Sequence, residues 1–117
     1  MSNLYHTLAE VYDTIYQSFI NYDEEYAYYS DKLRKYNSKS VIELGSGTGN
    51  LARRFIAGGF KYTGLDLNQA MLEIASKKNP GIEFIEADMR NFQLAEKRDA
   101  CIIAGRSASY CLQITML

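Results

Sequence analysis

The sequence predicts an α/β protein built on a parallel sheet. After residue 40, short β-prone runs alternate with helical stretches, the order expected when crossover helices connect parallel strands. A glycine-rich turn, Gly45-Ser46-Gly47-Thr48-Gly49, stands where the first of these runs ends and a helix begins. Ligands of open α/β sheets bind at the carboxyl ends of the strands, where such a turn lies. The length of 117 residues suits a single domain.

Four short, mostly apolar runs are the predicted strands: Val41–Leu44, Lys61–Asp66, Ile82–Glu86 and Ala100–Gly105. Between the first two, Leu51–Ala57 is a predicted helix that ends at Gly58 and Gly59, because glycine can adopt the left-handed conformation of a helix end. The next helix begins after Asn68, which can cap it, and stops at Pro80.

The segment before the sheet is predicted to form two amphipathic helices, since apolar and tyrosine residues recur every three or four positions from Leu4 to Tyr36. The break falls near residues 21–23, with Asp23 as the expected N-cap. Eight of the ten tyrosines lie here, either as a packing face or as the lining of a pocket. We expect residues 1–38 to form a helical cap on a βαβ core of residues 39–117.

Composition gives no support to several classes of function. A formal net charge of −1 gives no indication of nucleic-acid binding, and no apolar run is long enough to span a membrane. The first residues lack the features of a signal peptide, so we expect a cytoplasmic protein. Cys101 and Cys111 lack CxxC spacing and His6 has no neighbouring ligand, so no metal site is predicted.

The glycine turn and the acids around it indicate an adenosine-type ligand. Asp66 closes the second strand, the position from which a carboxylate accepts the hydroxyls of a ribose in dinucleotide-binding folds. A dinucleotide fingerprint would need glycine at Asn50, however, and Glu43 just before the turn suits a cationic ligand better than a phosphate.

At these residues the chain resembles class I S-adenosylmethionine-dependent methyltransferases. Their first motif is an acid followed by G-x-G-x-G, matched by Glu43, Gly45, Gly47 and Gly49. The family's acid after the second strand matches Asp66, and its acid-plus-apolar pair after the third strand matches Asp88-Met89. Upstream, residues 9–13 resemble a helix that many small-molecule methyltransferases fold over the cofactor, with Tyr12 where a tyrosine often touches it.

The resemblance implies a Rossmann-like three-layer fold, with a partial sheet of order 3-2-1-4, and S-adenosylmethionine as cofactor. It implies that Gly45 and Gly47 pass the methionine part, that Asp66 holds the ribose, and that Asp88 meets the adenine amino group while Met89 packs on the ring. The implied cofactor site also includes Tyr12, Glu43, Leu44, Gly49, Leu67 and Ala104. Asp66 and Asp88 could instead be solvated acids at strand ends, and we expect Glu43 to fix the loop through backbone amides.

The predicted function is therefore methyl transfer from S-adenosylmethionine to a small-molecule acceptor. The asparagine-proline-proline-tyrosine signature of amino-group DNA methyltransferases is absent. The family brings acceptor and methyl group together after the fourth strand, which makes Arg106, Ser107 and Tyr110 the candidate acceptor contacts. Two alternatives stay open: a NAD- or nucleotide-dependent Rossmann oxidoreductase, and a non-catalytic S-adenosylmethionine-binding module.

The resemblance breaks at the end of the chain, because the family's sheet usually has seven strands. We expect a fragment truncated after the fourth strand, followed by an apolar stub at residues 114–117. The unpaired outer edge of the fourth strand would then be exposed and open to self-association, since such edges recruit other chains.

Overall fold

The computed structural model describes residues 7–11, 13–15, 21–103 and 114–116, and its centre is one five-stranded sheet of order β3-β2-β1-β4-β5. β1 (Ser40–Leu44) lies between β2 (Lys61–Asp66) and β4 (Ala100–Ile103), and both pair with it in parallel. β3 (Glu83–Glu86) pairs in parallel with the outer side of β2. The predicted α/β class and the strand order 3-2-1-4 are confirmed.

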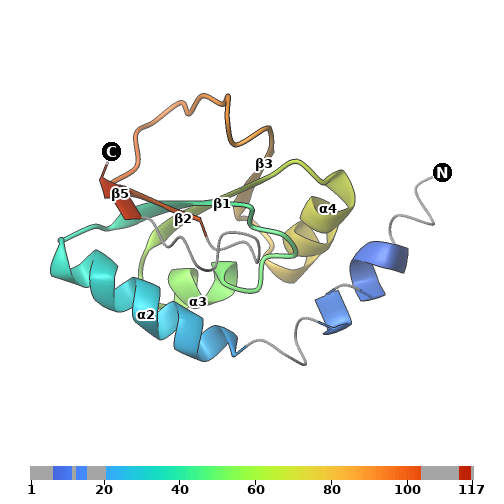
Figure 1. The fold of residues 1–117 in the computed structure, drawn as a ribbon, viewed down its shortest axis with the longest axis horizontal. Coiled ribbons are helices and arrows are strands. Elements are labelled where there is room, and N and C mark those ends of the chain that lie inside the picture. Colours follow the sequence, from blue (N-terminus) through green and yellow to red (C-terminus); the bar gives the residue numbers. More distant parts are fainter. Residues whose placement is uncertain (1–6, 12, 16–20, 104–113, 117) are drawn as a thin grey trace.

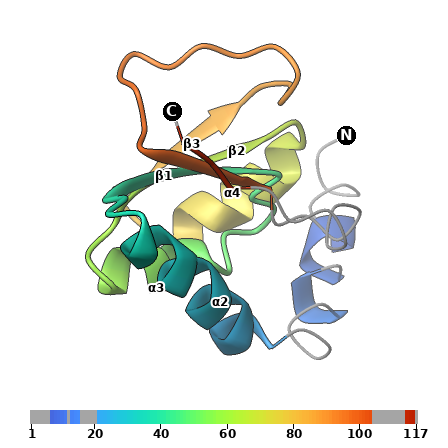
Figure 2. The same ribbon diagram turned by 60° about the vertical axis from the view of Figure 1, so that its left-hand side comes forward.

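Three helices cover one face of this sheet: α2 (Tyr22–Lys35), α3 (Ala52–Ala57) and α4 (Gln69–Lys78) (Figures 1 and 2). Residues 7–11 and 13–15 are helical too, which accounts for the first of the two predicted N-terminal helices. The expected cap of α2 was wrong. The Asn21 side chain accepts the Glu24 amide at 3.1 Å, whereas Asp23 lies inside the first turn and binds Arg54.

The core fills both sides of the sheet. On the helix-covered side, Leu33, Val41 and Phe55 are fully buried. The Tyr26 ring packs edge-on against the Phe55 ring, and the Tyr62 ring is stacked on it. On the other side, a second cluster of Ile42, Leu44 and Leu65 is covered by side chains from the segment after β3, including Ala87, Phe92 and Leu94. That segment arches over the sheet opposite the helices (Figure 1). The tyrosines thus serve packing at some positions, while Tyr28 and Tyr36 are exposed.

The expectation of an exposed fourth-strand edge was wrong. β5 (Ile114–Met116) runs antiparallel along β4 and pairs Ile114 with Ile102. The apolar residues expected as a stub therefore form a strand, because antiparallel pairing satisfies backbone N–H and C=O groups that would otherwise be left open. The hypothesis of self-association through β4 loses its structural basis.

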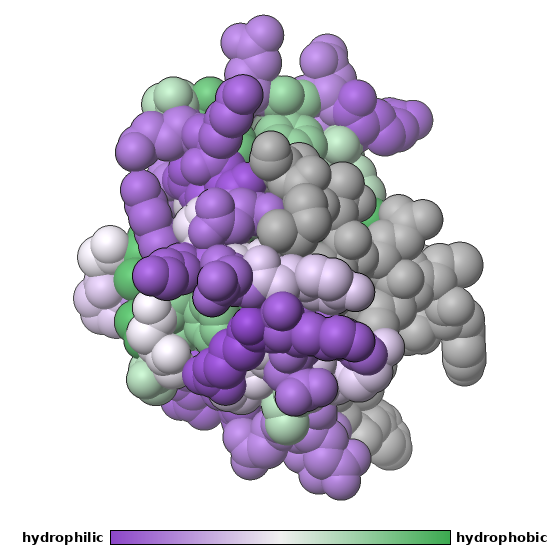
Figure 3. Space-filling view, turned by 90° about the vertical axis from the view of Figure 1, so that its left-hand side faces the viewer, coloured by the Kyte–Doolittle hydropathy of each residue, from purple (hydrophilic) through white to green (hydrophobic). Residues whose placement is uncertain are grey.

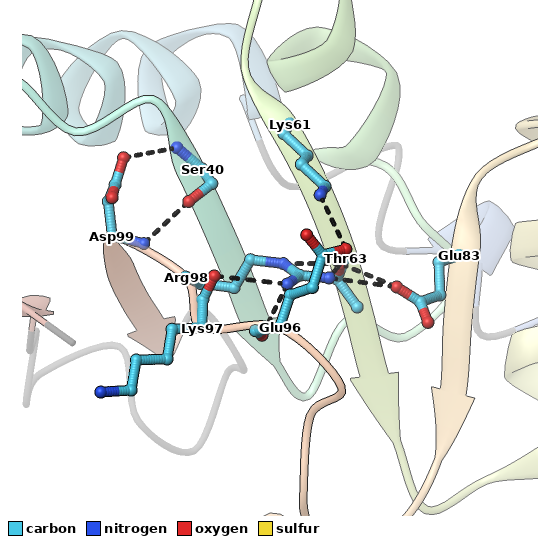
Figure 4. A network of polar contacts seen from close by, with 8 residues as sticks. All are labelled: Ser40, Lys61, Thr63, Glu83, Glu96, Lys97, Arg98 and Asp99. Atoms are coloured by element: carbon cyan, nitrogen blue, oxygen red, sulfur yellow. Dashed lines mark hydrogen bonds and ion pairs between the residues drawn. The ribbon is translucent and has the colours of Figure 1, made fainter.

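A polar network at the amino ends of the strands is shown in Figure 4. The buried Arg98 guanidinium donates to Thr63 Oγ1 at 2.8 Å, to Glu83 Oε1 at 3.2 Å and to the Glu96 carbonyl at 2.8 Å. The neighbouring Asp99 carboxylate accepts the Ser40 amide at 3.2 Å. These contacts tie the segment before β4 to β1, β2 and β3, at the end of the sheet opposite the glycine turn.

The side of the molecule on which α2 ends and β1 begins is largely hydrophilic in its described part (Figure 3). Small apolar areas are scattered among charged and polar residues, as is normal for a protein surface. None of the described helices is long and apolar enough to cross a membrane.

We predict that Arg98→Ala destabilises the chain without affecting the opposite end of the sheet. Loss of the guanidinium leaves buried acceptors such as Thr63 without their donor, which costs about 2 kcal/mol of unfolding free energy. Urea unfolding measures this cost. Lys97→Ala, an exposed neighbour, is the control; an equal loss in both variants would contradict a specific role for the Arg98 network.

Candidate cofactor site

The glycine turn adopts a backbone that requires its glycines. Gly45, Gly47 and Gly49 have φ angles of +76°, +58° and +78°, in the left-handed region that other residues rarely adopt. The amides of Gly45 and Ser46 both donate to the Leu65 carbonyl, at 2.7 and 3.0 Å. The turn that follows β1 is thereby fastened to the carboxyl end of β2.

Asp66 lies in direct contact with this turn. Its Oδ2 accepts the Gly47 amide at 2.9 Å, and its Oδ1 accepts the Asn68 amide at 2.9 Å. The side chain is half-buried. The structure therefore brings two separate sequence predictions together, and it is inconsistent with Asp66 as a merely solvated acid at a strand end.

Two exposed apolar side chains lie beside the predicted acids. Leu67, which follows the largely buried β2, is 66% exposed, and Met89, which comes after the partly exposed β3, is 42% exposed. Met89 Cε lies 3.7 Å from the point that a Cβ would occupy on Gly45, so Met89 borders the turn. The Ala87 amide donates to the Asp66 carbonyl at 3.1 Å, which holds the Asp88-Met89 segment next to β2. Apolar groups exposed together with acids are typical of a ligand surface.

Asp88 is held by a residue that the sequence analysis missed. Arg90 Nη2 donates to Asp88 Oδ2 at 2.6 Å, and Arg90 Nε and its backbone N–H donate to Oδ1 at 3.0 and 2.9 Å. These hydrogen bonds, the side-chain ones first, lower the pKa of Asp88 to about 2. Asp88 is therefore an ionised acceptor at neutral pH.

Glu43 differs from Asp88, because it is buried and its pKa is raised instead of lowered. It is buried in the helix-facing core, where the Tyr62 hydroxyl donates to Glu43 Oε1 at 2.5 Å. Burial raises the pKa of Glu43 to about 8, and the hydrogen bond from Tyr62 only partly opposes this. The expected fixing of the loop through backbone amides was wrong, because the side chain contacts Tyr62 on β2 instead.

A buried polar cluster behind the turn was also missed. Asp13 accepts hydrogen bonds from Thr48 and Asn50 and forms an ion pair with Lys78 on α4. The available signal was its place next to Tyr12, in the stretch that resembles the cofactor-covering helix. Lys78 lies in the last turn of α4, far from Asp13 in the sequence.

Five predicted site residues lie outside the described residues: Tyr12, Ala104, Arg106, Ser107 and Tyr110. Their assignments stay predictions. Leu44, the last residue of β1, is buried in the core cluster on the face opposite the helices. Because it directly precedes Gly45, it anchors the start of the glycine turn in the core.

A family model described as a methyltransferase domain matches residues 41–114, from β1 to β5. The chain belongs to this family. The matched span contains the glycine turn, Asp66 and Asp88 in the order that the sequence resemblance requires.

Curated relatives of this methyltransferase domain come from bacilli. A methyltransferase of Geobacillus sp. strain WCH70 is 32% identical over 116 residues, which covers 93% of the chain and 47% of that protein. An uncharacterised methyltransferase of Oceanobacillus iheyensis is 32% identical over 94 residues, or 77% of the chain and 44% of that protein. The chain thus spans about half the length of the curated relatives that it matches.

Solved structures with the same fold include two from actinobacteria. DesVI of Streptomyces venezuelae superposes with a TM-score of 0.76 at 29% identity, covering 87% of this chain and 44% of that one. CalS10 of Micromonospora echinaspora, an amino pentose methyltransferase solved with bound S-adenosylmethionine, gives 0.74 at 28% identity, covering 86% and 44%.

The described residues fit S-adenosylmethionine. A Cβ at Gly47 would meet no atom of the described residues within 4 Å, so they leave the outer side of the turn open to a ligand. Asp66 offers carboxylate oxygens beside this opening, and the exposed Leu67 and Met89 offer apolar surface beside the ionised Asp88. A ribose needs hydroxyl acceptors, and an adenine ring needs an apolar surface and an acceptor for its amino group.

We predict that alanine is tolerated much better at Gly47 than at Gly49. Both substitutions strain the left-handed backbone by about 1–2 kcal/mol. At Gly49 the added Cβ would also lie 2.8 Å from Asn79 Nδ2 and 3.0 Å from Ala75 Cβ, and such overpacking costs about 1–3 kcal/mol more. Thermal and urea unfolding of both variants test the order; equal destabilisation would contradict the packing at Gly49.

We predict that Glu43 makes the chain less stable as pH rises. Between its ordinary pKa of 4.5 and its raised pKa of about 8, Glu43 keeps its proton only in the folded state. The unfolding free energy then falls by up to about 1.4 kcal/mol per pH unit in this window. Glu43→Gln should remove the fall, and Glu24→Gln on the exposed surface of α2 should retain it. Parallel pH profiles for wild type and Glu43→Gln would refute the assignment.

Proposed function

We propose that this domain binds S-adenosylmethionine and belongs to an enzyme that transfers its methyl group to a small-molecule acceptor. The observation that carries the proposal is the contact between the Gly47 amide and the Asp66 carboxylate. It joins the glycine turn to Asp66, the proposed ribose-binding acid, at the carboxyl ends of β1 and β2. The membership in a methyltransferase family supports the same conclusion.

Each part of the cofactor has a proposed partner. The open glycine turn at Gly45 and Gly47 would pass the methionine part, and Asp66 would accept hydrogen bonds from the ribose hydroxyls. Leu67 and Met89 would enclose the adenine ring. The ionised Asp88 would accept its amino group.

The proposed contribution of the protein is alignment. When bound, the cofactor supplies a methyl group that its sulfonium already makes electrophilic. The chain's residues then have to hold the two reactants in line and exclude water, which are effects of position more than of acid–base chemistry. A base is needed only if the acceptor's nucleophile arrives protonated.

A small-molecule acceptor is the proposed substrate class. The similar CalS10 is an amino pentose methyltransferase, which supports an acceptor of this size. Arg106, Ser107 and Tyr110, after β4, remain the proposed acceptor contacts, and residues 1–38 the proposed cap over residues 39–117.

Calorimetric titration of this chain with S-adenosylhomocysteine tests the cofactor assignment. We predict binding by the wild type and a loss of about tenfold or more in Asp66→Asn, since a hydrogen bond to a charged group contributes about 1.5–3 kcal/mol. Asp31→Asn, on the exposed surface of α2, should bind as the wild type does.

Two outcomes would contradict the assignment. Absence of binding by a folded wild-type chain would remove the proposed cofactor site, and preference for NAD would favour the oxidoreductase alternative. Binding without turnover, by a chain as long as the curated relatives and supplied with candidate acceptors, would favour the non-catalytic module.

A further inference from the structure

The strongest unassigned feature is the buried polar cluster behind the glycine turn. Asp13, from helical residues 13–15, is 8% exposed. Its Oδ1 accepts the Thr48 hydroxyl at 2.5 Å and Asn50 Nδ2 at 3.0 Å. Its Oδ2 forms an ion pair with Lys78 Nζ at 2.8 Å. One carboxylate thus joins the N-terminal helix, the turn and α4.

The cluster closes on itself. Asn50 Nδ2 also donates to Thr48 Oγ1 at 3.1 Å, and Lys78 Nζ also donates to Asn50 Oδ1 at 2.8 Å. Asp13 and Asn50 therefore each contact the three other members of the cluster, and Thr48 and Lys78 each contact two. A closed set of hydrogen bonds of this kind specifies one arrangement, because moving one member leaves another buried polar group without its partner.

Thr48 and Asn50 flank Gly49, which packs directly against α4. Asn79 Nδ2 donates to the Gly49 carbonyl at 3.3 Å and to the Ala75 carbonyl at 2.9 Å. The back of the turn is thus held between the N-terminal helix and α4. Its front is the open side at Gly47.

The charge on Asp13 is essential to this arrangement. Burial raises the pKa of Asp13, but hydrogen bonds from Lys78, Thr48 and Asn50 outweigh burial and leave the pKa below its ordinary value. The carboxylate is therefore ionised at neutral pH. Removing its charge would leave the half-buried Lys78 without its counter-charge, which is costly in a poorly solvated site.

We propose that Asp13 is a positioning residue for the cofactor: its contacts with Thr48, Asn50 and Lys78 dock the N-terminal helix on the back of the glycine turn and hold the turn in its ligand-binding shape. Docking of this helix and binding of the methionine part are then coupled. This inference rests on the proposed binding of S-adenosylmethionine. The coupling acts on the methionine part because that part passes the turn, whereas the adenine would lie at Leu67 and Met89.

The test compares two ligands on one substitution. Asp13→Asn keeps the size of the side chain and removes its charge. Affinity for S-adenosylhomocysteine should fall by about tenfold, within the range of coupling between linked sites. Affinity for methylthioadenosine, which lacks the amino-acid part, should change by less than about threefold. Purely structural damage would weaken both ligands equally.

A matched control is Asp23→Asn. Asp23 also pairs with a cation of another helix, Arg54 at 2.7 Å, but its side chain is 85% exposed. Asp23 is linked to the turn only through Arg54, which donates to the Asn50 backbone carbonyl at 2.7 Å and makes no printed contact with Asp13. Both ligands should bind this variant as they bind the wild type. Lys78→Met removes the same ion pair from its other end and should reproduce the selective loss of affinity for S-adenosylhomocysteine. If Asp13→Asn does not fold, Lys78→Met tests the proposed role of Asp13 in its place.

The outcomes separate the inference from the function on which it rests. No binding of S-adenosylhomocysteine by the wild type overturns the proposed function. Wild-type binding that is unchanged in folded Asp13→Asn or Lys78→Met overturns the role of Asp13 alone. An equal loss of both ligands also overturns it, because the effect would then not be confined to the methionine side.

Discussion

The hydrogen bond from the Gly47 amide to the Asp66 carboxylate is the contact on which the candidate site depends. Gly47 donates this bond from a backbone with a positive φ angle, and the bond joins the turn after β1 to the end of β2. Two further attachments hold the same turn: the Leu65 carbonyl accepts the amides at its start, and the polar cluster around Asp13 holds its far end. A loop of five residues is thereby as well supported as a regular element.

Much of the fold could be predicted because its signals are local. The limits of β2 and the start of β4 were predicted to the residue, and the limits of β1 and β3 to within one residue, since each is a short apolar run bounded by turn residues. The predicted end of the fourth strand lies outside the described residues. The predicted N-cap of α2 was wrong because Asn21 and Asp23 are both favourable N-cap residues, and only the backbone conformation decides between them. The pairing of β5 with β4 was not predicted, because an apolar run contains no information about the strand edge with which it will pair.

The candidate site divides in the same way. The glycine turn and Asp66 follow from their spacing along the strands, whereas the Asp88-Met89 pair follows from the family resemblance. The structure places Gly47 beside Asp66 and Gly45 beside Met89. The partners of Glu43 and Asp13 could not be predicted in this way. Tyr62 and Lys78 come from other elements, and they contact these acids only after the sheet and α4 have formed. Pairs of this kind require a tertiary arrangement that no local pattern encodes.

The acids of the site also show that the residue type alone does not determine whether a side chain carries a charge. The sequence suggested that Glu43 provides negative charge for a cationic ligand. Burial instead raises the pKa of Glu43 to about 8, so it is largely protonated at neutral pH, whereas Arg90 lowers the pKa of Asp88 to about 2 and keeps it charged. Charge that favours a cationic ligand therefore has to come from acids at the surface of the site. Glu43 serves chiefly to join β1 to β2 through Tyr62, beneath the turn that the ligand would contact.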